Sequence, residues 1–262
     1  MISKITQKQL WGMVHVGPLP GTPHFQNQFE KNIERAVLEA KTLESLGFTG
    51  ILFENMHDVP YLNKKVGPEI TAAMAVLGFE IKKATSLPLG IQILAGANHE
   101  ALSVAEVVGA QWVRVEGFVF AHVGDEGIME ACAGELLRLR KALGAQEVKI
   151  MADIKKKHSS HAFTQDVDLV STAEAAQFFG ADAVIITGPS TGKAASTQEL
   201  KDLKKGLQIP VLIGSGITSQ NLKEYREADG FIVGSALKIQ GKWQNPIDPD
   251  ASSQIVQSFQ QL

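Results

Sequence analysis

Short apolar runs alternate with longer segments of helical periodicity along the whole chain. The clearest helical segment runs from about Phe29 to Leu46, where apolar side chains recur every three or four residues and Gly47 acts as the stop signal. The apolar runs are rich in Val, Ile and Leu, which is typical of strands buried on both faces of a parallel sheet. Eight runs are predicted to be strands: Trp11–Val16, Gly50–Asn55, Leu89–Ile93, Trp112–Glu116, Val148–Lys155, Ala183–Thr187, Val211–Gly214 and Gly230–Val233.

The strict alternation of strand and helix predicts an α/β fold with a parallel sheet. Eight units in 262 residues match the size of one (β/α)8 TIM barrel, and no linker or low-complexity tract divides the chain. We therefore predict a single (β/α)8 barrel domain over residues 1–262. Within it, Ser171-Thr-Ala-Glu174 and Ser196-Thr-Gln-Glu199 read as capping boxes that open helices, and Met129–Glu135 reads as helical.

Composition narrows the class of protein. An apolar fraction of 44% with 20% charged residues is typical of a globular domain, and a net charge of −3 offers no basic surface for nucleic acid. We expect no membrane span, because no apolar run approaches the required length. The N-terminal residues lack the apolar core of a signal peptide, and the single cysteine, Cys132, suits a reducing compartment. We therefore predict a cytoplasmic protein, with a homo-oligomer left open.

Gly-Ser turns end the last two predicted strands. In a (β/α)8 barrel these strands are neighbours whose ends hold a phosphorylated ligand. Each turn precedes a segment that reads as helical, so bare backbone N–H groups and serine hydroxyls would face an anion at the barrel mouth. We predict a phosphate-binding role for Gly214, Ser215, Gly216, Gly234 and Ser235.

The fifth predicted strand ends in the strongest catalytic pattern, Ala152-Asp-Ile-Lys-Lys-Lys-His158. Asp153 and Lys155 are two residues apart, so the period of a strand places both on the inward face and turns Lys156 away. A carboxylate beside an ammonium can transfer a proton or stabilise an enolate, and we predict both residues to be catalytic. Lys157 or His158 would reach the ligand's phosphate. The alternative is a structural salt bridge followed by a solvated loop.

His15 and Glu54 end the first two predicted strands and complete the predicted catalytic set. His15 can serve as an acid or a base, and Glu54 shares an inward face with Leu52. A buried carboxylate needs a partner, for which Arg114 is the evident choice, so a structural Glu–Arg network is the alternative. Polar residues at the other strand ends are predicted to bind substrate: Asn55, Gln92, Arg114, Glu116, His158 and Thr187.

The sequence contains no motif typical of a cofactor-binding or metal-binding site. No nicotinamide or flavin fingerprint is present, and Thr187–Lys193 departs from a nucleotide-binding P-loop in its glycine spacing and in Ala194. His57 and Asp58 lie near His15 in the predicted mouth but lack the spacing of a zinc motif. We expect neither a cofactor nor a metal.

Five motifs follow one another along the chain: Gly12-Met-Val-His-Val-Gly-Pro-Leu-Pro-Gly-Thr-Pro23, Glu54-Asn55, Glu135-Leu-Leu-Arg-Leu-Arg140, Ala152-Asp-Ile-Lys-Lys-Lys-His158 and Ile213-Gly-Ser-Gly216. Together they resemble the BtpA family of sgc-region-type barrels, over roughly Trp11 to Asp250 and most closely its uncharacterised eukaryotic branch. The resemblance implies a (β/α)8 barrel of the ribulose-phosphate-binding type. It implies no settled reaction, because cyanobacterial members are linked to photosystem I biogenesis, which describes a phenotype.

The sequence therefore favours an enzyme that acts on a phosphorylated sugar or a nucleotide-like molecule by lyase or isomerase chemistry. Two other classes stay open. One is a non-catalytic assembly or accessory factor, against which the inward Asp, Lys, Glu and Arg side chains count. The other is a nucleosidase-type hydrolase that would use Glu54 and Asp153 as paired carboxylates.

Overall fold

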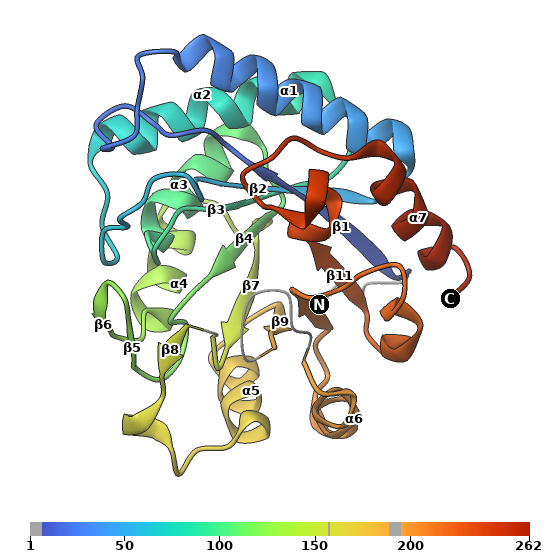
Figure 1. Cartoon of the computed structure of the whole chain (residues 1–262). Helices are drawn as coiled ribbons and strands as arrows, with labels where there is room; N and C mark the ends of the chain where they lie inside the picture. Colours follow the sequence, from blue (N-terminus) through green and yellow to red (C-terminus); the bar gives the residue numbers. More distant parts are fainter. Residues whose placement is uncertain (1–6, 157, 189–194) are drawn as a thin grey trace.

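The computed structural model describes residues 7–156, 158–188 and 195–262 and shows the predicted barrel. Its parallel strands close on themselves in the order β1-β11-β10-β9-β7-β4-β3-β2, so the last strand pairs with the first (Figure 1). All eight predicted strands are confirmed. They are β1 (Gln9–His15), β2 (Gly50–Glu54), β3 (Leu89–Gln92), β4 (Trp112–Val115), β7 (Lys149–Ile154), β9 (Ala183–Ile186), β10 (Val211–Gly214) and β11 (Gly230–Val233).

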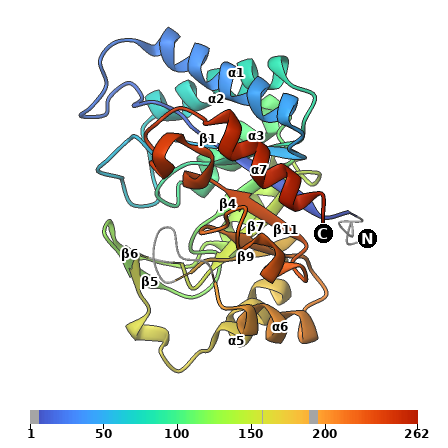
Figure 2. The same ribbon diagram turned by 45° about the vertical axis from the view of Figure 1, so that its right-hand side comes forward.

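Seven α-helices in the described residues cover the outside of the barrel (Figure 2). The predicted helix from Phe29 to Leu46 is confirmed, and Gly47 ends it in a left-handed conformation with φ of 94°. The capping box at Ser196 and Glu199 is also present. The helices are α1 (Phe29–Leu46), α2 (Pro68–Ala84), α3 (Asn98–Val108), α4 (Ala133–Ala142), α5 (Leu169–Phe178), α6 (Thr197–Gly206) and α7 (Pro249–Phe259).

Two local predictions were wrong. The N-cap of α5 is Asp168, whose carboxylate accepts a hydrogen bond from the Ser171 backbone amide at 2.7 Å, so Ser171 lies inside the helix. Aspartate is as good an N-cap as serine, so Asp168 can begin the helix three residues before Ser171. The stretch from Met129 is a strand end followed by a loop, because α4 begins at Ala133.

Short 3-10 turns replace the helices expected after the last two barrel strands. They are η2 (Leu222–Tyr225) after β10, and η3 (Ser235–Leu237) and η4 (Ile239–Gly241) after β11. The prediction that each Gly-Ser turn leads directly into an α-helix was therefore wrong. Any anion at these turns would be held by individual backbone amides, with little contribution from a helix dipole.

A small antiparallel sheet lies beside the barrel mouth and was not predicted. It consists of β5 (His122–Gly124), β6 (Gly127–Met129) and β8 (Ser159–Ser160) in the order β6-β5-β8, and the 3-10 turn η1 (Ala162–Thr164) follows it (Figure 1). The sheet joins the loop after β4 to the loop after β7. Strands of two or three residues are too short to leave a readable period in the sequence.

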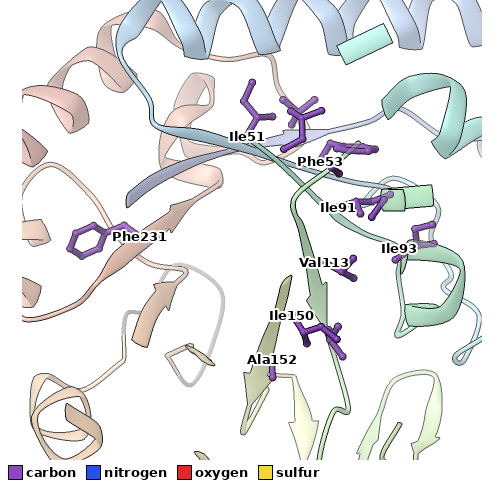
Figure 3. Packing of buried hydrophobic residues seen from close by; sticks show 14 of the residues in the cluster. Ile51, Phe53, Ile91, Ile93, Val113, Ile150, Ala152 and Phe231 are labelled. Atoms are coloured by element: carbon purple, nitrogen blue, oxygen red, sulfur yellow. The ribbon is translucent and has the colours of Figure 1, made fainter. Parts of the chain in front are cut away.

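The core forms two layers, separated by the wall of the barrel. Ile51, Phe53, Ile91, Val113 and Ile150 are fully buried and lie in the layer between strands and helices (Figure 3). Because side chains alternate along a strand, their neighbours fill the barrel interior. That inner cluster contains Trp11, Met13, Leu52, Met151, Ala183, Ile185, Leu212 and Ile232.

Polar side chains replace apolar ones at the carboxyl end of the barrel interior. His15 and Glu54 are partners in the register of β1 and β2, and Glu54 and Gln92 are partners in the register of β2 and β3. All three are buried, together with Asp153 on β7. No helix in the described part of the chain is long and apolar enough to cross a membrane.

Candidate active site

A cavity of about 550 Å³ opens at the carboxyl ends of the barrel strands. This is the end at which (β/α)8 enzymes carry their active sites, and the volume suits a small-molecule ligand. The structure brings most of the predicted site residues to this one cavity. Those that line it are His15, Glu54, Gln92, Arg114, Glu116, His158, Gly214, Ser215, Gly216, Gly234 and Ser235.

His15 and Glu54 form a pair suited to moving a proton. His15 Nε2 lies 3.4 Å from Glu54 Oε1, and His15 Nδ1 lies 3.1 Å from the Trp243 carbonyl oxygen. The carbonyl only accepts, so Nδ1 carries the hydrogen and Nε2 faces the carboxylate. Burial lowers the pKa of His15 to about 3, with the charge of Lys238 adding to the effect. In the neutral ring Nε2 therefore carries a lone pair, and a proton taken up here would lie between Nε2 and the Glu54 carboxyl group.

Trp243 and Lys238 support His15 from the segment after β11, and the sequence pattern gave no sign of this. The Trp243 ring contacts the rings of His15 and His57 edge-on, with centroids 6.1 and 4.7 Å apart. Lys238 anchors the segment through a buried ion pair with Glu39 of α1, with Nζ and Oε2 2.6 Å apart. The histidine is therefore oriented by a chain segment more than 200 residues away.

Arg114 binds Asp153, which corrects the predicted pairing of Arg114 with Glu54. Arg114 Nε and Nη2 donate to the two carboxylate oxygens of Asp153 at 2.8 and 3.0 Å. β4 and β7 are adjacent in the barrel, and both side chains point inward from them. Burial opposes charge on the guanidinium, but Asp153 holds the pKa of Arg114 above its usual value. The bidentate pair fixes Asp153 and engages both of its carboxylate oxygens.

Lys155 and Lys156 have exchanged the orientations that strand periodicity predicted. β7 ends at Ile154, and Lys155 adopts a left-handed conformation with φ of 47°, so the alternation of side chains stops there. Lys155 Nζ donates to the Thr164 carbonyl oxygen at 2.9 Å, and Lys155 does not line the large cavity. Lys156 does line it, and its Nζ lies 3.0 Å from Glu116 Oε2. The ammonium at the mouth therefore belongs to Lys156.

Glu116 connects Lys156 to Gln92. The Gln92 Nε2 donates to Glu116 Oε1 at 3.0 Å, while Lys156 donates to the other carboxylate oxygen. Burial raises the pKa of Glu116, and Lys156 acts in the opposite direction. Burial also disfavours the charged form of Lys156, but Glu116 and neighbouring carboxylates raise its pKa overall. The site therefore holds a charged ammonium at neutral pH.

Asn55 and Thr187, predicted to bind substrate, lie outside the residues that line the large cavity. Asn55 Nδ2 donates to Asp58 Oδ2 at 2.8 Å, and its carbonyl oxygen accepts from the Leu94 amide at 2.7 Å. Asp58 in turn accepts from the Leu19 amide, so this pair ties three loops together. Thr187 follows β9, and its buried hydroxyl has no partner among the described residues. Lys157 and residues 189–194 lie outside the described part of the chain.

At the ends of β10 and β11, the cavity is lined by the backbone of the two Gly-Ser turns. Ser215 and Gly216 have φ of 143° and 72°, and Gly214 has no room for a side chain, because a Cβ there would lie 2.3 Å from Ile185. The amides of Gly216, Ser235 and Ala236 donate to no other described residue. Bare amides of this kind form an anion-binding surface. The phosphate-binding role of these turns stays a prediction, and the structure places all five predicted residues on the lining of one cavity.

A second, small chamber lies between the antiparallel sheet and β7. Asp153, Lys155 and Lys156 line it together with His122 and His161, whose rings are 5.5 Å apart. His122 is buried, and its Nε2 has no hydrogen-bond partner among the described residues. Burial lowers the pKa of His122 to about 4, with smaller contributions from Lys156 and His161.

The buried His122 should make stability depend on pH. Its folded pKa of about 4 lies below the ordinary value of about 6.5, so the unfolded chain takes up a proton first as the pH falls. Stability from this residue is complete above pH 6.5 and is lost toward pH 4. In His122→Gln, the free energy of unfolding should lose less on acidification, by up to about 1.4 kcal/mol per pH unit. Urea unfolding of both proteins between pH 7 and 5 measures this, and parallel pH curves would contradict it.

Metal-binding groups do not assemble in the described part of the chain: no three His, Cys, Asp or Glu side chains there are placed to hold an ion. Cys132 is the residue preceding α4, where Asn98 Nδ2 lies 3.3 Å from its Sγ. Burial raises the pKa of the Cys132 thiol, which disfavours the reactive thiolate.

Fold and site together define a closed (β/α)8 barrel whose large cavity contains the His15–Glu54 pair and the Gly-Ser turns that end β10 and β11. The model of the BtpA family matches residues 6–261, so the chain belongs to the BtpA family. An uncharacterised protein of Caenorhabditis elegans, whose name includes "mitochondrial", is 44% identical over 97% of this chain and 93% of its own length. The photosystem I biogenesis protein BtpA of Synechocystis is 33% identical over 97% of this chain and 88% of its own.

Solved structures share the fold at low sequence identity. One of them is (S)-3-O-geranylgeranylglyceryl phosphate synthase from Thermoplasma acidophilum, in complex with its substrate sn-glycerol-1-phosphate. It superposes with a TM-score of 0.63 at 18% identity, covering 98% of this chain and 95% of the synthase. At that identity the likeness supports the barrel fold, in agreement with the strand order described above.

Proposed function

We propose that this protein is an enzyme that acts on a phosphorylated small molecule by acid–base chemistry of the lyase or isomerase type. One observation carries the proposal: a single cavity combines the bare amides of Gly216, Ser235 and Ala236 with the neighbouring side chains of His15 and Glu54. The amides suit a phosphate, and the pair suits proton transfer at the other end of the ligand. The likeness in fold to a synthase whose substrate is a glycerol phosphate agrees with it.

The cavity supplies the three groups that such a reaction needs. The His15–Glu54 pair would take a proton from the substrate and return it at another atom, so no oxidant or reductant is consumed. The Lys156 ammonium would stabilise the negative charge that develops on oxygen while the proton is away. Arg114, fixed by Asp153, adds a second positive charge to the same wall. In this proposal Lys156 takes the role that the sequence suggested for Lys155, and Asp153 positions Arg114.

Lys156→Met should lower turnover about a hundredfold with little change in substrate affinity, because the ammonium acts mainly in the transition state. Lys155→Met is the matched control: it removes the same group from a neighbouring position outside the large cavity and should retain most of the turnover. Steady-state kinetics on the substrate identified by the screen described next compares the two. The reverse order of effects would return the catalytic role to Lys155.

A thermal-shift screen against sugar phosphates and nucleoside monophosphates tests the proposed function. A ligand that binds the folded state raises its melting temperature in proportion to concentration and affinity. We expect a subset of phosphorylated compounds to stabilise the protein and their unphosphorylated parents to have no effect. If the unphosphorylated compounds stabilise the protein equally, the phosphate group is not recognised and that part of the proposal is wrong.

Two alternatives can be weighed against the geometry. An accessory role is favoured by the name of the Synechocystis relative, but such a role gives no reason to gather the ionisable side chains of Glu54, Arg114, Glu116 and Lys156 in one cavity. A nucleosidase would need Asp153 as a second reactive carboxylate. Both Asp153 oxygens accept hydrogen bonds from Arg114, which disfavours that role.

The proposal includes a reducing compartment, because the single cysteine is buried as a free thiol. The cytoplasm satisfies this condition. The mitochondrial matrix does as well, and the name of the worm relative points there. Cell fractionation of the native source distinguishes the two compartments.

A further inference from the structure

The end of the large cavity opposite the Gly-Ser turns presents hydrogen-bond acceptors. Gln92 is 2% exposed, and its amide orientation is fixed because Nε2 donates to Glu116. Its Oε1 therefore faces away from Glu116, and this oxygen is buried without a hydrogen-bond partner among the described residues. A buried acceptor left unpaired costs free energy, and a ligand that donates to it recovers that cost.

Neighbouring groups on this wall are acceptors as well. The Tyr61 hydroxyl donates to the Met56 carbonyl oxygen at 2.8 Å, which leaves the Tyr61 oxygen to accept. Glu54 lies beside Gln92 in the register of β2 and β3, and Asp125 and Glu126 at the tip of the β5–β6 hairpin line the same cavity. A ligand that fills this end must therefore bring several hydrogen-bond donors.

Hydroxyl groups fit these acceptors better than a cationic amine does. Arg114 and Lys156 line the same cavity, and both are held in their charged forms by carboxylate partners. Two of the acceptors, Gln92 Oε1 and the Tyr61 oxygen, are neutral, so a hydroxyl can satisfy them, whereas a cationic amine would lose far more hydration free energy on entering the cavity. Carboxylate and amide oxygens side by side are a common way to hold sugar hydroxyls.

We infer that Gln92, Glu54 and Tyr61 form a subsite for the hydroxyl groups of a polyhydroxylated chain whose other end carries the phosphate. β3 lies three strands from β11 around the barrel, so the chain would cross the cavity and pass the His15–Glu54 pair. The inference rests on the proposed function and narrows its substrate class to sugar or polyol phosphates.

Three five-carbon probes test the subsite: ribitol 5-phosphate, pentyl phosphate and 5-aminopentyl phosphate. They share the phosphate and the chain length and differ in the donors along the chain. By isothermal titration calorimetry, ribitol 5-phosphate should bind at least about tenfold more tightly than pentyl phosphate. In Gln92→Met, which keeps the length of the side chain, that advantage should shrink to about threefold or less, while the affinity for pentyl phosphate stays the same.

Each outcome decides a separate point. If the two phosphates bind equally to the wild-type protein, the subsite is refuted and the phosphate site stands. If 5-aminopentyl phosphate binds most tightly, the subsite recognises a cation and the assignment to hydroxyls is wrong. If the ribitol advantage survives in Gln92→Met, the hydroxyl site lies elsewhere. If none of the three binds, the proposed function fails and the subsite fails with it.

Discussion

Arg114→Met should lower the free energy of unfolding by about 3–5 kcal/mol. The substitution leaves the carboxylate of Asp153 buried in the barrel interior without the guanidinium that now donates to both of its oxygens. An unpaired charge at this depth must either be protonated or draw water into the barrel, and both are costly. Guanidinium chloride denaturation followed by circular dichroism measures the loss.

Two further variants separate the buried pair from a general effect of losing an arginine. Arg140→Met removes a partly exposed partner of Asp182, at the same 2.8 Å distance, and should cost only about 1 kcal/mol. Arg114→Met combined with Asp153→Leu should recover much of the loss, because no buried charge remains. If the double variant is no more stable than Arg114→Met, the two residues are not energetically coupled in the way their geometry indicates.

Ser235→Asp should weaken the binding of phosphate-bearing ligands by about 1000-fold. A carboxylate about 4 Å from a phosphate charge costs about 4 kcal/mol at the effective dielectric of a partly buried site. Ser235 is preferred to Gly216 for this test, because Gly216 has φ of 72° and any side chain there would add backbone strain. Titration calorimetry with pentyl phosphate gives the affinity.

Ser235→Asn is the matched control for this prediction. Asparagine has the shape of aspartate without its charge, so the difference between the two variants isolates electrostatic repulsion from steric blocking. We expect Ser235→Asn to lose less affinity than Ser235→Asp by at least about tenfold. Equal affinities in the two variants would mean that the phosphate binds away from the end of β11.

The periodicity of apolar residues was sufficient to predict the barrel fold, because the same strand–helix pattern recurs eight times along the chain. All eight strands were located, since most are apolar runs buried on both faces, as Val211–Gly214 illustrates. The inward direction of Glu54 also followed from alternation with Leu52, and the structure confirms that both are buried. The position of a strand and the direction of its side chains depend on neighbouring residues in the sequence, so a single sequence is enough to predict them.

Alternation failed where a strand had already ended. Lys155 and Lys156 exchanged roles because a single left-handed residue after Ile154 resets the direction of every side chain beyond it. Nothing in the run of three lysines marks where that residue falls. The partner of Arg114 was within reach of the sequence: the predicted barrel already places the fourth strand, with Arg114, beside the fifth, with Asp153, and two strands away from Glu54.

Contacts from distant segments were beyond any local pattern. Trp243 fixes the orientation of His15 through a backbone carbonyl, which carries no sequence signature. The acceptor character of Gln92 depends on the direction of its amide, which Glu116, directly after β4, determines. The small antiparallel sheet that brings Asp125 and Glu126 to the cavity consists of strands too short for a period to show.

A crystal structure with a five-carbon sugar phosphate bound would show directly which groups hold each end of the ligand. We expect phosphate oxygens within about 2.7–3.2 Å of the amides of Gly216, Ser235 and Ala236, with the carbon chain reaching toward His15 and Glu54. A ligand bound in the cavity with its phosphate at Lys156, or a phosphate found only outside the barrel mouth, would contradict the assignment of both ends of the site.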